Sequence, residues 1–148
     1  MSEHSIAHST FSLERTYRVA PQLVFAAWSD PGAKARWFGV PGGEHELDFR
    51  VGGREVNRAQ LDNGVQMEFE SFYRDIVPDE RIVYASTLSA DDVVATVSTT
   101  TIQIESAPEG ARLLLIEQAT FLDGREQPDW RQRGTSDWLD RLGPELSP

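Results

Sequence analysis

The feature that most constrains the fold of this chain is a series of closely spaced turn signals after residue 42. Clusters of Gly, Pro, Asp, Asn and Ser recur at Gly52-Gly53, Asp62-Asn63-Gly64, Pro78-Asp79, Ser89 to Asp92 and Pro108-Glu109-Gly110. These residues favour tight turns, and the runs between them have the length and composition of β-strands. The connections are too short for the crossovers that parallel strands need. We therefore expect one antiparallel sheet.

Six strands fit around these turns, and a seventh precedes them. The six lie near residues 44–51, 54–61, 65–77, 81–88, 93–106 and 111–121. The earlier strand lies near residues 10–19, where apolar residues such as Phe11, Leu13 and Tyr17 share one parity. This alternation is typical of a strand with one buried face.

Two short helices are predicted between the first strand and the second. Pro21 suits a first helical position, and apolar residues follow it at helical spacing as far as Trp28, which predicts a helix over residues 21–29. Asp30 and Pro31 then provide an N-cap and a first helical proline, which predicts a second helix over residues 31–38.

A longer helix is predicted at the C-terminus. Trp130, Gly134, Trp138 and Leu142 recur every four residues, and Gly143-Pro144 is expected to end the run. A sheet with one apolar face needs a cover, and this helix can supply it. The fold class is therefore α+β.

Length and composition limit the organisation and the partners. A chain of 148 residues should form one domain, which we place at residues 9–144, with a disordered tail at 1–8 and a frayed end at 145–148. The absence of cysteine favours a reducing compartment, and we find no signal peptide and no span of membrane length, so a cytoplasmic protein is expected. A net charge of −10 without a basic patch argues against nucleic acid and anionic membranes as partners.

Four stretches of the chain resemble one family. They are RVAPQLVFAAWSDPGAKARWFG, LDFRVGGRE, FYRDIVPDERIVY and DWLDRL. In order and spacing they are similar to the activator-of-heat-shock-protein-90-ATPase-like branch of the START and birch-pollen-allergen superfamily. The resemblance implies a helix-grip fold, in which a curved seven-stranded antiparallel sheet wraps around the C-terminal helix and two short helices close one end of a cavity. Members include co-chaperone domains, lipid carriers and polyketide cyclases, so the fold does not by itself fix a function.

Aromatic residues are the main candidates for a ligand site in such a cavity. The expected lining consists of Trp37, Phe38, Phe49, Phe69, Tyr73, Tyr84, Trp130 and Trp138. Ligand pockets are mostly apolar with a few polar groups, although the same residues could simply fill the core. Because Trp37 and Phe38 lie where the resemblance places the cavity mouth, we expect part of this aromatic surface to face a cavity.

Two charged residues occupy apolar positions of the terminal strands. Arg15 shares the parity of Phe11 and Tyr17, and Glu117 shares that of Leu113 and Leu115. The resemblance makes the first and last strands neighbours, so we expect Arg15 and Glu117 to be partners, because buried charges are tolerated only when paired. As an alternative, Arg15 is a candidate anchor for an anionic head group.

The remaining signals favour binding over catalysis. His4 and His8 lie in the expected tail and His45 is isolated, so we expect no metal site, and no fingerprint for a nucleotide cofactor is present. The leading hypothesis is a non-enzymatic carrier or sensor of a small hydrophobic or amphipathic molecule, acting as a monomer or a homodimer. The alternatives are a co-chaperone-like module with a protein partner, and a polyketide cyclase-like enzyme.

Overall fold

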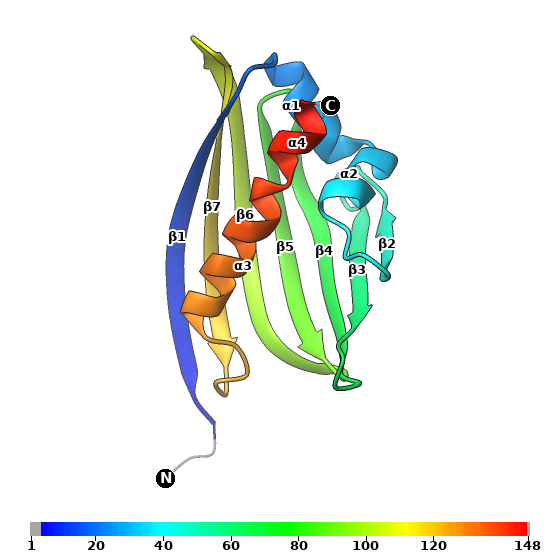
Figure 1. Cartoon of the computed structure of the whole chain (residues 1–148). Helices are drawn as coiled ribbons and strands as arrows, with labels where there is room; N and C mark the ends of the chain where they lie inside the picture. Colours follow the sequence, from blue (N-terminus) through cyan, green and yellow to red (C-terminus); the bar gives the residue numbers. More distant parts are fainter. Residues whose placement is uncertain (1–3, 148) are drawn as a thin grey trace.

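Seven strands and four helices make up the part of the chain that the computed structural model describes, residues 4–147 (Figure 1). In chain order they are β1 Ile6–Tyr17, α1 Pro21–Ser29, α2 Pro31–Trp37, β2 Glu44–Leu47, β3 Arg54–Gln60, β4 Gln66–Val77, β5 Arg81–Ala90, β6 Val93–Ala107, β7 Gly110–Leu122, α3 Pro128–Asp140 and α4 Leu142–Leu146. The predicted order of elements is confirmed.

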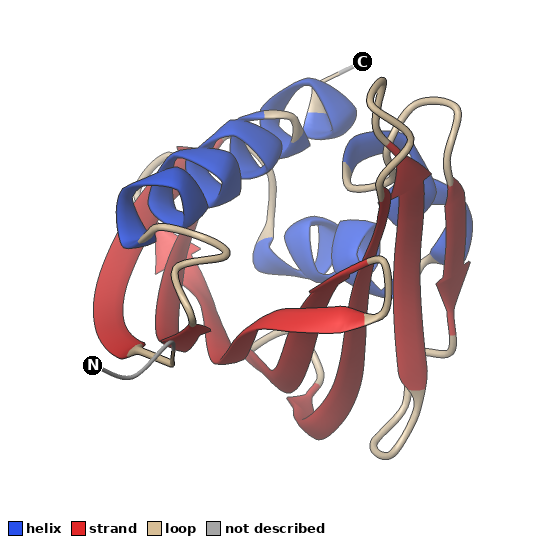
Figure 2. Cartoon of the chain, turned by 90° about the horizontal axis from the view of Figure 1, so that it is seen from below, coloured by secondary structure: helices blue, strands red, loops and turns tan. Residues whose placement is uncertain are grey.

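The strands form one antiparallel sheet with the order β1-β7-β6-β5-β4-β3-β2. The sheet is strongly curved, and all four helices lie on its concave side (Figure 2). The predicted contact between the first and last strands is confirmed, since Ile6 to Tyr17 of β1 pair with Leu122 to Ala111 of β7. This is the α+β helix-grip arrangement.

The short helices begin where the sequence predicts. Pro21 and Pro31 occupy the first turns of α1 and α2, where the missing backbone N–H is not needed. The Asp30 side chain accepts a hydrogen bond of 2.8 Å from the backbone N–H of Ala33 and so caps α2. These two helices close one end of the curved sheet (Figure 1).

The C-terminal helix differs from the prediction in two ways. Gly143-Pro144 does not end it, because α3 ends at Asp140 and Pro144 lies in the first turn of α4, where proline is tolerated. Its buried face is also rotated. Arg131, Thr135 and Leu139 are buried, whereas Trp130 is 56% exposed. The stripe of Trp130, Gly134 and Trp138, which are spaced four residues apart, therefore lies along the edge of α3 and not on its core face.

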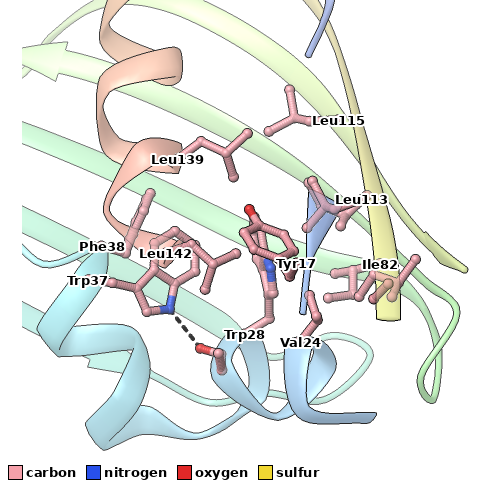
Figure 3. Packing of buried hydrophobic residues seen from close by; sticks show 14 of the residues in the cluster. Tyr17, Val24, Trp28, Trp37, Phe38, Ile82, Leu113, Leu115, Leu139 and Leu142 are labelled. Carbon is pink, nitrogen blue, oxygen red and sulfur yellow. Dashed lines mark hydrogen bonds between the residues drawn. The ribbon is translucent and has the colours of Figure 1, made fainter. Parts of the chain in front are cut away.

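The core lies between the concave face of the sheet and the helices. Leu113 and Leu115 of β7 and Ile102 of β6 are fully buried there, together with Leu139 and Leu142 from the C-terminal helices. Figure 3 shows Leu139 and Leu142 among the buried residues of this core. The large rings of α1 and α2 complete it at the closed end of the sheet.

The expected chain ends need correction. β1 begins at Ile6, four residues before the predicted start, because residues 6–8 pair with Thr120 to Leu122 of β7. At the other end, the expected frayed segment contains the last turn of α4, which runs to Leu146. Residues 1–3 and 148 of the expected tails lie outside the described residues.

Candidate ligand pocket

A pocket of about 220 Å³ opens between α3 and the sheet. Six aromatic and aliphatic side chains line it, together with four ionisable groups. The lining residues are Phe38, Val40, Asn57, Phe69, Leu88, Glu117, Glu126, Trp130, Arg131, Gly134, Thr135, Trp138 and Arg141. Gly134 has open space beside its α-carbon, so this turn of α3 leaves room for an occupant.

Four of the predicted site residues meet in this pocket: Phe38, Phe69, Trp130 and Trp138. Phe38 comes from the residue after α2, Phe69 from β4 and the two tryptophans from α3. The ring centroids of Phe38 and Trp138 lie 4.9 Å apart at 90°, an edge-to-face contact that fixes both rings. Phe38 and Phe69 lie 6.2 Å apart.

Four other predicted site residues pack in the core, outside the pocket lining. Trp37 is 1% exposed, and its indole Nε1 donates a hydrogen bond of 2.8 Å to the carbonyl oxygen of Ala27 (Figure 3). Tyr73 and Tyr84 are also buried, and Phe49 packs against Tyr73 with centroids 4.9 Å apart. These four residues therefore fill the core, which was the alternative expectation for them.

Arg15 does not pair with Glu117, so that prediction is wrong. The register of β1 and β7 places Phe11 opposite Glu117 and Leu113 opposite Arg15. The offset of four residues amounts to about 13 Å along a strand. Arg15 reaches α3 instead, where its Nη2 lies 3.0 Å from Asp140 Oδ1 and donates to Ser136 Oγ at 2.9 Å. Arg15 is absent from the pocket wall.

The partner of Glu117 is Arg131, which sequence reasoning missed. Arg131 Nη1 lies 3.3 Å from Glu117 Oε2, and both side chains are almost fully buried. Arg131 also contacts Glu126, through Nε to Oε2 at 3.1 Å and through Nη2 to Oε1 at 2.8 Å. Glu117 shares the parity of apolar residues, which predicted its burial. The sequence did not show which face of α3 turns towards the sheet, so it could not identify Arg131 as the partner.

Burial sets the protonation behaviour of this pair. Desolvation raises the pKa of Glu117 above its ordinary value, and the nearby Arg131 only partly offsets that effect. Thr100 Oγ1 donates a further hydrogen bond to Glu117 Oε1, at 3.4 Å. The pocket therefore contains a buried carboxyl group with weak partners, a feature that often marks functional sites.

A second buried polar cluster lies beside the pocket and centres on Glu55. Its carboxylate accepts three hydrogen bonds, from Lys34 Nζ at 3.0 Å, from Tyr73 Oη at 2.6 Å and from His45 Nε2 at 2.7 Å. His45 is therefore not isolated, contrary to the sequence-based expectation, because β2 pairs with β3 and brings its ring to Glu55. Lys34 Nζ also lies over the rings of Trp28, Trp37 and Phe38.

The Lys34–Glu55 pair is ionised at neutral pH. Burial alone would raise the pKa of Glu55, but the Lys34 charge and the three hydrogen bonds lower it to about 2. Burial also lowers the pKa of Lys34, which opposes ionisation of the pair. We favour the ionised form because a carboxylate with three donors is strongly stabilised and because three aromatic faces surround the ammonium group.

Phe38 connects this cluster to the pocket. The Lys34 ammonium lies 4.5 Å from its ring centroid, and Asn57 Nδ2 donates to its carbonyl oxygen at 3.0 Å. Asn57 Oδ1 also accepts a hydrogen bond from the backbone N–H of Val40. The Glu55 cluster thus holds one wall of the pocket in place.

Other features of residues 4–147 offer no comparable site. A larger hollow of about 610 Å³ lies on the outer face of the sheet and is lined mainly by exposed charged side chains such as Glu105 and Arg112. No three His, Asp or Glu side chains in this range are grouped so that they could hold a metal ion. No helix in it is long and apolar enough to cross a bilayer.

Solved structures of similar proteins share this architecture. A protein from Rhizobium leguminosarum is 36% identical with a TM-score of 0.93, and 97% of each chain is covered. Mll3558 from Rhizobium loti is 37% identical with a TM-score of 0.89, and 95% of this chain and 99% of that one are covered. CalU16 from Micromonospora echinospora shares the fold, at 18% identity and a TM-score of 0.68, over 98% of this chain and 85% of that one.

The sequence was also compared with curated proteins and with family profiles. No curated protein gave a significant match. The profile of the activator of Hsp90 ATPase homolog 1-like proteins matches residues 18–146, which include every residue of the pocket and of the Glu55 cluster. The family suggests a ligand-binding helix-grip domain, in agreement with the fold. The chain therefore belongs to the activator of Hsp90 ATPase homolog 1-like family.

Proposed function

We propose that this protein binds a small amphipathic molecule in the pocket between α3 and the sheet, as a carrier or a sensor. The observation that supports the proposal is the pocket itself, in which aromatic walls stand beside the buried pair of Glu117 and Arg131. Ligand sites combine mainly apolar walls with a few polar groups that orient the ligand, and this pocket has that composition.

The size of the pocket limits the ligand. Its volume of about 220 Å³ is below the range of roughly 300–1,000 Å³ that is usual for drug-sized ligands. A molecule with one ring or a short chain fits this space, whereas a long-chain lipid would need the helices to move. Burial of apolar surface at roughly 25 cal/mol per Å² can then support a modest affinity after the cost of ordering.

Tryptophan emission offers a direct test, because Trp130 and Trp138 line the pocket. Titration with small one-ring compounds should give a saturable change in emission, and the compound should be recovered chemically unchanged. Phe69→Ala should weaken binding about tenfold or more, since a buried ring contact is lost.

Phe72→Ala is the matched control for that variant. Phe72 lies on the same strand, β4, but outside the pocket lining, where it contacts Arg74. This variant should bind like the wild type. No saturable response to any compound, or equal losses in both variants, would contradict the proposal and favour a co-chaperone-like interaction module.

A second candidate function is acid–base chemistry on the bound molecule. Glu117 favours it, because this buried carboxyl group lines the pocket and its pKa is raised. Under this alternative, a ligand incubated with the protein would be recovered as a product, and Glu117→Gln would abolish the conversion while leaving binding in place. Recovery of unchanged ligand would support the carrier or sensor.

A further inference from the structure

The hydrogen bonds of Glu117 leave much of its acceptor capacity unused. Glu117 is 2% exposed and lines the pocket. Its two partners are distant, with Arg131 Nη1 at 3.3 Å and Thr100 Oγ1 at 3.4 Å. Charge-assisted bonds normally measure about 2.7–2.9 Å, and an ionised carboxylate offers roughly four acceptor positions. A donor on a ligand would therefore meet a buried acceptor with free positions.

The charges at the inner end of the pocket leave an excess of carboxylate. Glu117 and Glu126 supply two acidic groups, whereas Arg131 is the buried base between them. Arg131 makes its shorter contacts with Glu126, so Glu117 is the less neutralised of the two. The other basic residue of the wall, Arg141, is exposed, so water and salt screen its charge.

The pocket walls favour a cation as well. Aromatic faces attract ammonium groups through the negative charge density above the ring. In the pocket wall, Phe38 and Phe69 already face Lys34 and Arg131, and Trp130 and Trp138 are the other two rings. The same chain already uses this interaction nearby, where the Lys34 ammonium lies 4.5 Å from the Phe38 centroid and is paired with Glu55. A net charge of −10 on the whole chain favours the approach of cations.

We propose, on the basis of the ligand-binding function above, that the pocket selects small amines, with the apolar ring against the aromatic walls and the ammonium group on Glu117. An N–H of the ligand would occupy the free acceptor positions of the carboxylate. An anionic ligand would instead bring a third carboxylate beside Glu117 and Glu126, with Arg131 as the one buried guanidinium of the wall to share among all three.

Three probes with the same phenyl ring and similar length separate the possibilities: 2-phenylethylamine, 2-phenylethanol and 3-phenylpropionate. Binding is measured by calorimetry and by tryptophan emission at neutral pH and low salt. We expect the amine to bind about tenfold more tightly than the alcohol, because a bond to a charged acceptor is worth more than a neutral one. The carboxylate should bind most weakly.

The variant Glu117→Gln tests the assigned residue. It keeps the size of the side chain, and Arg131 keeps Glu126 as a partner, so the fold should be retained. The preference for the amine over the alcohol should fall to about twofold or less, which corresponds to loss of the charged acceptor. Glu109→Gln makes the same charge change in the exposed turn between β6 and β7 and should keep the full preference.

The outcomes separate this inference from the function on which it rests. Binding of all three probes with similar affinity would overturn the amine selectivity and leave the pocket as a ligand site. An unchanged preference in Glu117→Gln would overturn the role of Glu117. Absence of saturable binding by these three probes would overturn the amine selectivity, whereas only the absence of a response to every compound of the wider titration would overturn the ligand-binding function.

Discussion

At the scale of single residues, Glu55 is a buried carboxylate that three side chains hold in place. It is 2% exposed and accepts bonds from Lys34, Tyr73 and His45, which come from α2, β4 and β2. One carboxylate therefore joins three elements at the closed end of the sheet. A buried ion pair stabilises the fold only while both charges are present. If one charge is removed, the other stays buried without a partner, and the folded state is destabilised.

We predict that Glu55→Gln lowers the free energy of unfolding by about 3–5 kcal/mol at pH 7, because the Lys34 ammonium is left without its carboxylate. The pH dependence should change as well. The folded pKa of Glu55, about 2, lies below the ordinary value of 4.5, so its stabilisation is present above pH 4.5 and is lost as the pH falls towards 2. Urea unfolding between pH 2 and pH 7 measures both effects.

Glu70→Gln is the control for this prediction. Glu70 pairs with Arg54 on the neighbouring strand, but both side chains are partly exposed. Pairs of this kind contribute about 0–1 kcal/mol, so this variant should unfold nearly like the wild type. Equal stability of the two variants at pH 7 would contradict the central role of Glu55.

At the scale of the elements, α3 has separate faces for the core and for the pocket. Leu139 is fully buried against the sheet, while Trp130 is 56% exposed at the rim of the pocket. Both are large apolar residues, and the tryptophan is the larger. Their effects on stability should follow burial and not size.

We predict that Leu139→Ala lowers the free energy of unfolding by about 2–5 kcal/mol, because it removes core packing and leaves a cavity. Trp130→Ala should change it by only about 0.5 kcal/mol, since a ring at the surface contributes little. Chemical denaturation of the two variants compares them directly. A larger loss in Trp130→Ala would mean that the tryptophan spacing marks the core face after all.

At the scale of the whole molecule, the C-terminal helices cover a sheet that cannot bury its concave face alone. Leu139 and Leu142 are both fully buried, and they belong to the same core cluster as Leu113 and Leu115 of β7 (Figure 3). A curved sheet without this cover would expose a continuous apolar surface to water.

We predict that truncation after Gly134 abolishes cooperative unfolding, because it removes both leucines together with Trp138. Calorimetry should show no sharp transition, and a dye that binds exposed apolar surface should respond to the truncated chain. Removal of the last two residues only is the control and should leave the melting temperature nearly unchanged, since Ser147 is exposed. A sharp transition near the wild-type temperature in the chain truncated after Gly134 would contradict the prediction.

The sequence by itself determined the elements and their order. Turn residues between strand-like runs specified a seven-stranded antiparallel sheet, and Pro21 with Asp30-Pro31 specified α1 and α2, because these are local properties of the backbone. Parity also indicated that Glu117 is buried, since strand side chains alternate between two faces. The family resemblance made the first and last strands neighbours, and this expectation is confirmed.

Only the tertiary structure decided which side chains meet. Alternation along a strand gives its face but not its offset from a neighbour, so the expected Arg15–Glu117 pair lies four residues out of register. Helical spacing likewise shows which residues share one side of a helix, but not which side faces the sheet. In the structure Arg131 faces Glu117, and Trp130 lies at the rim of the pocket. His45 gained its place through the pairing of β2 with β3. Contacts between distant segments depend on register, rotation and packing, which no local pattern records.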